Sequence, residues 1–574
     1  MSAVTPETIS IDGTRKARGN LTGARIRWAM AFVLIVFSVM FGRLIWLGNV
    51  EVDTTIEGQT RDAIMASRPA ILDRNGLEMA VDIRVPSLFA EPRRIIDVDE
   101  AADAILTVLP NLDSAWLRDR LTGDKGFVWV ARELTPAQRD RIMRLGIPGL
   151  DFLEESKRFY PGGTVAAHVM GAVNIDNVGI AGVEKHLDDD NLALLQNLGL
   201  ARDSALTPVN LAMDLRVQSI LHEELVSSME RYQAIAAGGA IMDVRTGEII
   251  AMASLPDFDP NNPGTMLEEG RFNRLTAAKF EVGSIFKPIT FAAALDAGAV
   301  RLTDTIDARF GVRFGRYTIE DFHGQYRMLS VPEVFRYSSN IGTIRIMQAL
   351  GKDNFRAFLT RMGLEGAPQI ELPEVTRSSI PANFSEVGAA TASFGHGLSV
   401  TPLQMLTATA ALVNGGHLMD ATLFPRTEQE AMTGSTQVIS AQTSDYLRYL
   451  MRLNGVVGSG STGNKIADGY RWGGKTGTAE KVVDGQYSSS LVTAFFSSAF
   501  PLDDPRYALI IFVDEPQAEN AQSGRTAGWN AGQMSARIVK RIAPMLGIQP
   551  ILGPQIDAQL VPVQLRNGAE FTGF

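Results

Sequence analysis

A serine and a lysine three residues apart, Ser284 and Lys287, stand directly before an apolar stretch typical of a helix. A serine hydroxyl needs a nearby base to take its proton, and a lysine can be that base if burial or a neighbouring positive charge keeps it neutral. Residues three apart on a helix are neighbours, and a helix N-terminus offers free N–H groups. The pair therefore predicts a nucleophile and its base, although an ordinary helix start explains the same pattern.

Two further motifs favour the chemical interpretation. Ser338-Ser339-Asn340 and Lys475-Thr476-Gly477 follow in the order of the S-x-N and K-T-G motifs that accompany S-x-x-K in penicillin-binding proteins and serine β-lactamases, and each occurs once. Taken singly, Ser338 and Asn340 could cap the next helix, and the Lys-Thr-Gly triplet could end a strand. Together the three motifs predict one cleft, in which Lys475 helps Lys287 to lose its proton.

Composition excludes or disfavours several other chemistries. The chain has 574 residues and no cysteine, so disulfides and thiolate nucleophiles are excluded. Its six histidines are scattered, with no HExxH, no G-x-S-x-G and no histidine beside a candidate serine, so zinc hydrolysis and a Ser-His-Asp triad have little support. A net charge of −10 argues against nucleic acid as a partner.

The N-terminal region predicts a membrane anchor. Residues 28–48 form a stretch of 21 residues whose one charge is Arg43, about the length that a spanning helix needs. The preceding 27 residues are polar and basic, which predicts a cytoplasmic N-terminus and a large portion on the other side of the membrane. A cleaved signal peptide is the alternative, but no small-residue cleavage site follows the apolar stretch.

Strand and helix patterns in the second half of the chain predict an α+β domain with one antiparallel sheet. Residues 236–254 read as two strands around a turn at Thr246-Gly247, and residues 490–500 and 507–516 as two more strands. A helix is expected at about 525–546, and the middle, about 280–460, is mostly helical.

Before this domain, the patterns are weaker. Residues 68–80 predict a strand, an Asn-Gly turn and a second strand. Glycine-rich residues 158–188 predict an irregular connector with little core of its own. An amphipathic helix follows residue 210, with an apolar side formed by Leu215, Ile220, Leu221, Leu225 and Met229.

With these motifs, the chain resembles the class B penicillin-binding proteins, the monofunctional D,D-transpeptidases of bacterial wall synthesis. The resemblance covers nearly the whole chain. It rests on ILDRNG (71–76), RFYPGGTVAAHVMG (158–171), GIAGVEKHLD (179–188), PDFDPNN (256–262), NRLTAAKFEVGSIFKP (273–288), FGHGLSVTPLQ (394–404), GGKTGTAEK (473–481) and FVDEP (512–516).

The resemblance implies a role for each motif residue. Ser284 would be the acylated nucleophile and Lys287 its base. Ser338 and Asn340 would relay protons and orient the substrate amide, and Lys475 would be an electrostatic anchor. The remaining implied residues bind substrate: Thr476 and Thr478 hold its terminal carboxylate, Gly477 allows its close approach, and the N–H groups of Ser284 and Thr478 form the oxyanion hole.

The resemblance also implies the reaction and the partners. Ser284 would attack the penultimate D-Ala carbonyl of a stem peptide, and an amine of a neighbouring stem peptide on lipid II-derived glycan strands would resolve the acyl-enzyme; penicillins and other β-lactam antibiotics would acylate the same serine. No metal or organic cofactor is implied. The division-specific (FtsI-type) protein is the first choice, which implies an FtsW-type glycosyltransferase and other divisome proteins as partners, at the division site of the inner membrane.

Alternatives within and outside the family stay open at this point. The elongation-specific class B transpeptidase is the runner-up. A penicillin-binding sensor or scaffold without transpeptidase activity is the alternative of a different class, disfavoured because one span is expected and all three motifs are intact. A bifunctional synthase would need a glycosyltransferase domain, and a β-lactamase would be shorter and soluble.

The expected architecture follows from the same resemblance. It is a penicillin-binding/serine transpeptidase fold, an antiparallel sheet with helices, preceded by an elongated non-catalytic pedestal domain and one N-terminal transmembrane helix. The expected parts are a cytoplasmic tail (1–27), the anchor (28–48), the pedestal (49–205), the transpeptidase domain (206–547) and a C-terminal tail (548–574). One departure is Val282, where the family commonly has proline, which leaves the backbone shape before Ser284 open.

Overall fold

The computed structural model describes residue 28 and residues 30–41, 68–189, 207–483 and 485–566. The chain forms two compact units, Met1–Ile64 and Met65–Phe574. In the first unit, residues 28 and 30–41 are helical and exposed. Within the described ranges, no helix has both the length and the hydropathy needed to cross a membrane. The expected anchor extends beyond these ranges, and the expected cytoplasmic tail lies outside them.

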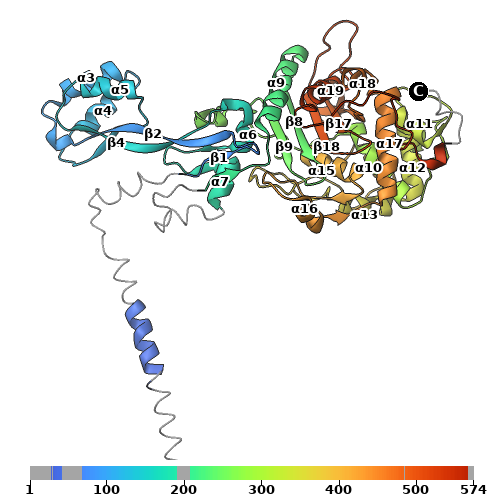
Figure 1. Ribbon diagram of the computed structural model, residues 1–574, viewed down its shortest axis with the longest axis horizontal. Coiled ribbons are helices and arrows are strands. Elements are labelled where there is room, and N and C mark those ends of the chain that lie inside the picture. The colour runs from blue at the N-terminus through green and yellow to red at the C-terminus, as the bar shows by residue number, and fades with distance from the viewer. Residues whose placement is uncertain (1–27, 29, 42–67, 190–206, 484, 567–574) are drawn as a thin grey trace, which may run out of the picture. The chain divides into compact units, whose positions relative to one another are not determined.

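The second unit contains a five-stranded antiparallel sheet (Figure 1). Its strand order is β16-β17-β18-β8-β9. The four strands predicted from sequence are confirmed, and the expected turn between β8 and β9 has Gly247 at φ +76°. The strands are β8 (Ala236–Asp243), β9 (Ile249–Leu255), β16 (Gly473–Val483), β17 (Gln486–Phe500) and β18 (Tyr507–Asp514).

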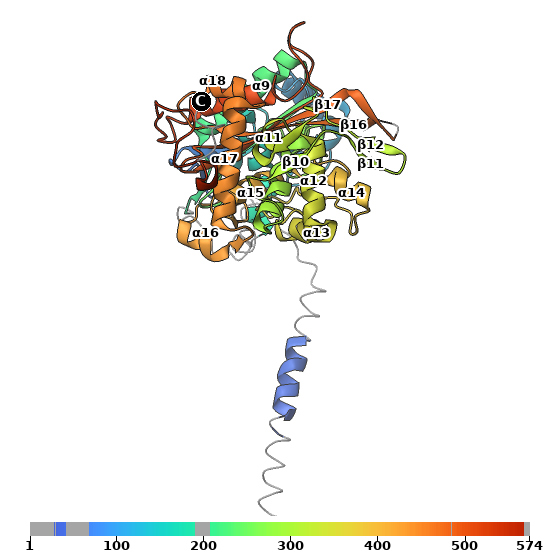
Figure 2. The same cartoon turned by 90° about the vertical axis from the view of Figure 1, so that its right-hand side faces the viewer.

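Helices cover both faces of this sheet, so its strands are apolar on both sides. Along β18, Leu509 and Ile511 pack into the core under α9 and α19, while the alternate residues Ile510 and Phe512 pack into the core under α10, α15 and α17. Figures 1 and 2 show these two helical layers. The helices are α9 (Leu215–Tyr232), α10 (Lys287–Asp296), α15 (Pro402–Val413), α17 (Ala441–Val457) and α19 (Ala531–Ile542).

The two helices predicted at the ends of this domain are present. The apolar side predicted for α9 is confirmed, because its residues are buried or partly buried in the two cores. Asp214 caps the helix by accepting a hydrogen bond from the N–H of Arg216. Helix α19 is shorter than the predicted range of about 525–546, since Asn530 caps it at residue 531.

The remaining elements of the domain lie mostly between β9 and β16 or follow α19. They are η4 (Pro263–Leu267), η5 (Gly283–Phe286), β10 (Thr305–Asp307), β11 (Val312–Phe314), β12 (Tyr317–Ile319), β13 (Met328–Ser330), α11 (Val331–Arg336), α12 (Asn340–Leu350), α13 (Lys352–Arg361), α14 (Glu386–Ala392), β14 (His417–Leu418), α16 (Glu428–Gly434), β15 (Thr436–Gln437), α18 (Ser461–Ile466) and η6 (Val563–Leu565). Near the chain end, Leu560 and Leu565 pack into the same core as α10.

The N-terminal part of the second unit is built on a long antiparallel pair, β2 and β4. The predicted strand-turn-strand at 68–80 is confirmed: the Asp73 carboxylate accepts from the N–H groups of Asn75 and Leu77 in the turn, and from Leu215 at the start of α9. This part contains β1 (Ile71–Leu72), β2 (Glu78–Ala90), η1 (Pro92–Arg94), α3 (Val98–Val108), α4 (Ser114–Leu121), β3 (Val128–Ala131), α5 (Pro136–Met143), β4 (Leu150–Phe159) and β7 (Val209–Asn210).

The expectation of an irregular connector at 158–188 is wrong. Glu184 is fully buried, and its two carboxylate oxygens accept from Nε of Arg68 (2.9 Å) and Nε of Arg158 (2.6 Å). A buried ion cluster of this kind needs complete pairing, so it orders the short elements around it. They are η2 (Gly163–Ala166), α6 (Ala167–Met170), β5 (Ala172–Val173), β6 (Gly179–Ala181) and α7 (Gly182–Leu187).

Two side-chain amides join this part to the sheet domain. The side-chain amide of Asn261 accepts from the N–H of Tyr160 (3.0 Å) and donates to the carbonyl of Tyr160 (3.1 Å). It pairs with Tyr160 as the main chain of an adjacent strand would. The Gln218 amide on α9 donates to the carbonyl of Val165 (2.6 Å). The motifs at 158–171 and 256–262 therefore meet at the junction.

We expect Glu184→Gln to destabilise the chain, because the substitution removes the carboxylate that two buried guanidinium groups share and leaves each of them one carboxylate partner, Asp188 for Arg68 and Asp82 for Arg158. The expected loss is about 1–3 kcal/mol, seen as a lower midpoint in calorimetric unfolding. Glu154→Gln is the matched control, since Glu154 forms a half-exposed pair with Arg139 and its loss is expected to cost less than about 1 kcal/mol. Equal midpoints for the two variants would contradict the role given to the cluster.

Candidate active site

Ser284 and Lys287 occupy two successive elements. Ser284 lies in the 3-10 turn η5 and Lys287 is the first residue of α10, so the prediction that both start one α-helix is wrong in detail. Residues three apart are eclipsed in a 3-10 turn, so both side chains still leave the same side of the chain. Ser284 is partly exposed whereas Lys287 is completely buried.

Glycines allow the turn that carries Ser284 to touch β16 through backbone atoms. Gly283 has φ +56°, and a Cβ there would lie 2.8 Å from the carbonyl oxygen of Thr478. A Cβ on Gly477 would lie 2.6 Å from the carbonyl oxygen of Val282 and 2.8 Å from the nitrogen of Ile285. Gly477 is therefore required for the close contact between β16 and the turn, independently of its predicted role in substrate approach.

The backbone at Val282, where the resemblance led us to expect proline, has a conformation that suits valine. Its φ of −99° lies outside the usual proline range near −65°, and its side chain is fully buried in the core. Valine therefore fits this backbone, and its packing contributes to holding the turn in place of ring rigidity.

Lys287 is bonded to the second motif. Its Nζ donates to Oδ1 of Asn340 (2.8 Å), to Oγ of Ser338 (3.1 Å) and to the carbonyl oxygen of Ser338. Among the described residues, Oγ of Ser284 has no hydrogen-bond partner. The structure thus brings the lysine to Ser338 and Asn340 and leaves the serine hydroxyl unengaged.

The capping explanation of Ser338 and Asn340 is wrong, because Ser339 is the residue that caps α12. Oγ of Ser339 accepts from the N–H of Gly342. Ser338 has φ +54°, an uncommon conformation for a residue with a side chain, and Asn340 is the first residue of the helix. Strained backbone of this kind gathers at functional sites.

Asp321 supports the second motif and was not found from the sequence. Its carboxylate accepts from Oγ of Ser339 (2.6 Å) and from the N–H of Ile341 (3.0 Å) at the positive end of α12. The carbonyl of the preceding residue, Glu320, accepts from Nδ2 of Asn340 (3.3 Å). No sequence signal separated Asp321 from other acidic loop residues, because its partners are chosen by the fold.

Lys475 lies inside β16, where it pairs with Ser497 of β17, so the strand-end explanation of the third motif is wrong. Its side chain is 1% exposed and its Nζ donates to the carbonyl of Thr476 (3.0 Å). Burial lowers the pKa of Lys475 to about 7. Burial and then the charge of Lys475 hold the pKa of Lys287 well below its ordinary value, while Asp321 acts in the opposite direction.

The two threonines of the third motif have different partners. Oγ1 of Thr476 donates to Oγ of Ser459 (2.7 Å), and Oγ1 of Thr478 accepts from the N–H of Ala527 (3.2 Å). Asn454 holds Ser459 and the strand together by donating to Oγ of Ser459 and to the carbonyl of Gly474. Ser459 and Asn454 are further site residues that sequence reasoning missed.

The chemistry that this arrangement supports is acyl transfer to serine. A partly exposed hydroxyl, a buried lysine biased toward its neutral form, and a second lysine meet where η5, α12 and β16 converge. Each candidate residue named from the sequence lies in one of these three segments or next to one of them: Lys287 directly follows η5, and Ser338 directly precedes the cap of α12. The geometry is consistent with the predicted roles, which stay predictions.

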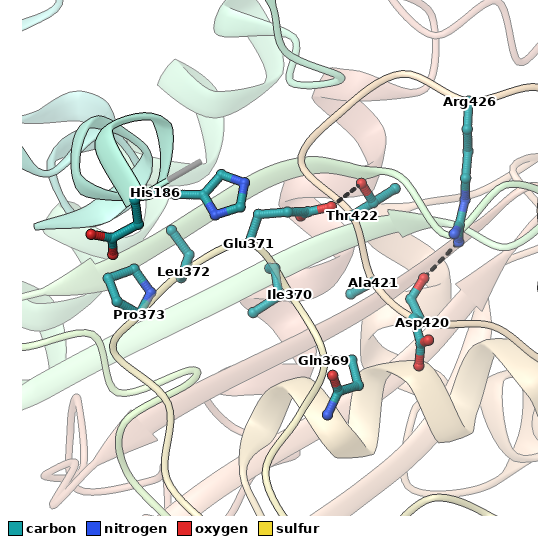
Figure 3. A pocket seen from close by; sticks show the side chains of 11 residues that line it. His186, Gln369, Ile370, Glu371, Leu372, Pro373, Asp420, Ala421, Thr422 and Arg426 are labelled. Atoms are coloured by element: carbon teal, nitrogen blue, oxygen red, sulfur yellow. Dashed lines mark hydrogen bonds between the residues drawn. The ribbon is translucent and has the colours of Figure 1, made fainter. Parts of the chain in front are cut away.

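A separate pocket of about 520 Å³ lies away from these residues (Figure 3). Its polar groups are largely paired with protein: Glu371 accepts from Oγ1 of Thr422 and the N–H of Leu423, and Arg426 donates to the carbonyls of Thr246 and Asp420. The pocket is lined by His186, Asp189, Gln369, Ile370, Glu371, Leu372, Pro373, Asp420, Ala421, Thr422 and Arg426. None of the three motifs contributes to it.

Comparison with known proteins identifies both parts of the second unit. Residues 237–540 match the penicillin binding protein transpeptidase domain, and residues 63–191 match the penicillin-binding protein dimerisation domain. The chain is 35% identical to the probable peptidoglycan D,D-transpeptidase FtsI of Caulobacter vibrioides, over 86% of this chain and 83% of that protein. It is 30% identical to peptidoglycan D,D-transpeptidase FtsI of Escherichia coli K12, over 87% and 89% respectively.

Solved structures share the fold at lower identity. Penicillin-binding protein 3 of Mycobacterium tuberculosis, solved in complex with aztreonam, superposes with a TM-score of 0.65 at 22% identity, covering 86% of this chain and 98% of that one. Penicillin-binding protein 2X of Streptococcus thermophilus gives the same TM-score at 21% identity, over 84% and 79%.

We expect Asp321→Asn to move the pH dependence of Ser284 acylation to lower pH. In the predicted role, Lys287 takes the serine proton only when neutral, so the rate falls as pH drops through the pKa of Lys287. Asp321 raises that pKa, and removing its charge therefore lowers it. Stopped-flow acylation by a penicillin across a pH series measures the shift.

Glu320→Gln is the matched control for this variant, because only the main-chain carbonyl of Glu320 touches Asn340. Its pH profile should match the parent. An Asp321→Asn profile that falls in amplitude without moving along the pH axis would show that Asp321 acts through geometry alone.

Proposed function

The chain belongs to the class B penicillin-binding proteins, the FtsI-type peptidoglycan D,D-transpeptidases, and on that premise we propose that it cross-links stem peptides at the division septum through an acyl-enzyme on Ser284. The observation that carries the assignment of residues is the buried Lys287, bonded to Ser338 and Asn340 beside the partly exposed Ser284.

The first half of the reaction is acylation. Neutral Lys287 takes the proton of Ser284 as Oγ attacks the penultimate D-Ala carbonyl, and the N–H groups of Ser284 and Thr478 hold the oxyanion. When the intermediate collapses, the C–N bond breaks and the departing D-Ala amine receives a proton. Ser338, which Lys287 already contacts, lies on the path for that proton.

The residues of the third motif are the proposed binding site for the substrate carboxylate. Thr476 and Thr478 present hydroxyls for the terminal carboxylate, and Lys475 contributes positive charge behind them. Asn340 orients the substrate amide. These roles follow from the family assignment and agree with the contacts that hold the residues.

The second half of the reaction transfers the acyl group. An amine from a neighbouring stem peptide attacks the Ser284 ester, loses its proton to the Lys287 and Ser338 pair, and forms the cross-link as the serine Oγ regains a proton. A β-lactam follows the first half and stays attached as an ester, because ring opening leaves no free leaving group to make way for the amine.

The division role draws on the relatives, since proteins named FtsI align along most of this chain. The elongation-specific transpeptidase is the competing assignment. A sensor or scaffold without transpeptidase activity is the alternative of a different class, and it lacks support because all three motifs converge in one site.

The proposed location is the inner membrane at the division site, with the N-terminus cytoplasmic and the catalytic domain periplasmic. Residues 30–41 are helical with exposed apolar side chains, as suits part of a lipid-facing anchor. We propose residues 1–27 as the cytoplasmic tail, 28–48 as the anchor, 49–205 as the pedestal, 206–547 as the transpeptidase domain and 548–574 as the C-terminal tail. An FtsW-type glycosyltransferase and other divisome proteins are the proposed partners.

Ser284→Ala should abolish covalent labelling of the purified chain by a fluorescent penicillin, because Ser284 is the proposed nucleophile and Oγ of Ser338, which also lies beside Lys287, already accepts a hydrogen bond from it. Gel fluorescence after denaturation measures the label. Ser490→Ala, at an exposed serine on β17, is the control and should label like the parent. Labelling that persists in a folded Ser284→Ala protein would refute the nucleophile assignment.

Depletion of the protein in its host should give filamentous cells, because septal cross-linking is the step that would stop. Phase-contrast microscopy during depletion checks this outcome. Swollen or rounded cells would instead assign the protein to elongation while leaving the transpeptidase chemistry in place.

A further inference from the structure

A short stretch of the transpeptidase domain exposes an unusual number of aromatic side chains. Phe310 is 73% exposed, Tyr317 59%, Phe322 81% and Tyr326 66%. Large apolar groups gathered on a surface mark a place where something binds. The stretch contains the β11–β12 hairpin, which stands at the margin of the domain in Figure 2.

Arginines alternate with these aromatics. Residues 309–336 contain five arginines and three acidic residues, in a chain whose net charge is −10. Arg313 donates to the carbonyl of Gly315, Arg316 to the hydroxyl of Tyr317 and Arg336 to the carbonyl of Val457. None of these three forms an ion pair with a described residue, so their charges are available to an anion.

The guanidinium groups also stack on the aromatic rings. Arg316 lies 5.0 Å from the ring centre of Tyr317, and Arg336 lies 5.0 Å from that of Tyr337. Stacking holds a guanidinium flat and leaves its N–H edges free to bind carboxylates in pairs. We call residues 309–328 together with Arg336 and Tyr337 the arginine–aromatic surface.

This surface is joined to the active site at both of its ends along the chain. Strand β12 leads into Glu320 and Asp321, which contact Asn340 and Ser339, and Phe322 is the next residue. At its other end, Tyr337 directly precedes Ser338. The surface is therefore fixed to the N-terminal end of α12, on the second-motif side of the reacting serine.

The side chains of the surface are suited to bind a polymer that carries both hexose rings and carboxylates. Aromatic rings pack against the apolar faces of hexose rings, and arginine forks bind carboxylates. A nucleic acid would offer flat bases and phosphates, but the net charge of the chain disfavours it.

We propose that the arginine–aromatic surface binds the glycan strand and the carboxylate-bearing stem peptides of uncross-linked peptidoglycan next to the reacting serine. The proposal rests on the proposed function, because it extends the substrate site of that reaction. The surface holds a strand beside Ser284, raises the local concentration of stem peptides, and contributes nothing to the bond-making groups themselves.

Two double variants test the proposal in the full-length protein in detergent. Arg313→Glu with Arg316→Glu reverses the unpaired charges, and Phe310→Ser with Tyr317→Ser removes exposed rings. Ile83→Ser with Arg84→Glu is the matched control, at an exposed apolar residue and an exposed arginine on β2. The probes are fluorescent uncross-linked glycan strands with intact stem peptides, and the same strands stripped of peptides by an amidase.

We expect the arginine variant to bind intact strands at least tenfold more weakly, with a smaller salt dependence than the parent. The ring variant should weaken binding to intact and stripped strands alike. All variants should be acylated by a soluble penicillin at the parental rate, which also shows that they are folded. The control variant should bind strands like the parent.

Three results would overturn the proposal: parental strand binding in both surface variants, failure of the penicillin-reactive parent to bind strands, or loss of a protein partner from the variants while strand binding stays intact. The last would assign the surface to a protein. Failure of the parent to react with penicillin would instead refute the proposed function, so the two failures are distinguishable.

Discussion

The burial of two lysine ammonium groups in one cleft is the constraint on which the rest of the site depends. Lys287 is fully buried and Lys475 is 1% exposed. Taking a charged ammonium out of water is costly unless oxygen atoms surround it or it gives up its proton. Both responses are present: oxygens of Ser338, Asn340 and Thr476 accept from the two ammonium groups, and both pKa values are lowered. The burial that disfavours the charge therefore favours the neutral amine that the proposed base needs.

That burial requires three segments to approach more closely than side chains normally permit. The turn that carries Ser284 touches β16 through Gly283 and Gly477, and its backbone N–H at residue 283 donates to the carbonyl of Gly395. Strand β16 is an edge strand of the sheet, so this side is open to the turn. The sheet itself is held by helices on both faces, which gives the edge a firm support. Position and acidity of the reacting groups thus come from one packing arrangement.

Charged side chains have different surroundings in the two parts of the second unit. The part of the chain before the sheet domain buries a paired ion cluster around Glu184, which orders short elements. In the arginine–aromatic surface, Arg316 and Arg336 are stacked on rings and lack ion pairs with the described residues. Arg309 and Arg327 of the same surface do form ion pairs, with Asp307 and Glu333. Asp321 accepts from the N–H of Ile341 at the start of α12, and its charge raises the pKa of the buried Lys287. A basic surface next to the cleft is suited to bring an anionic polymer to the serine.

The sequence by itself determined the strand pattern and the apolar side of α9 and indicated the candidate reacting groups, because motif spacing and hydrophobic period are local properties. It could not determine that Ser339 is the cap, that Ser284 lies in a 3-10 turn, or that residues 158–188 are ordered by buried ions. Those outcomes depend on partners far away in the chain: Asp321 for Ser339, β16 for the turn, and Arg68 for Glu184. Only the tertiary structure decided them, since the free energy of a buried charge or a backbone contact depends on what surrounds it in space.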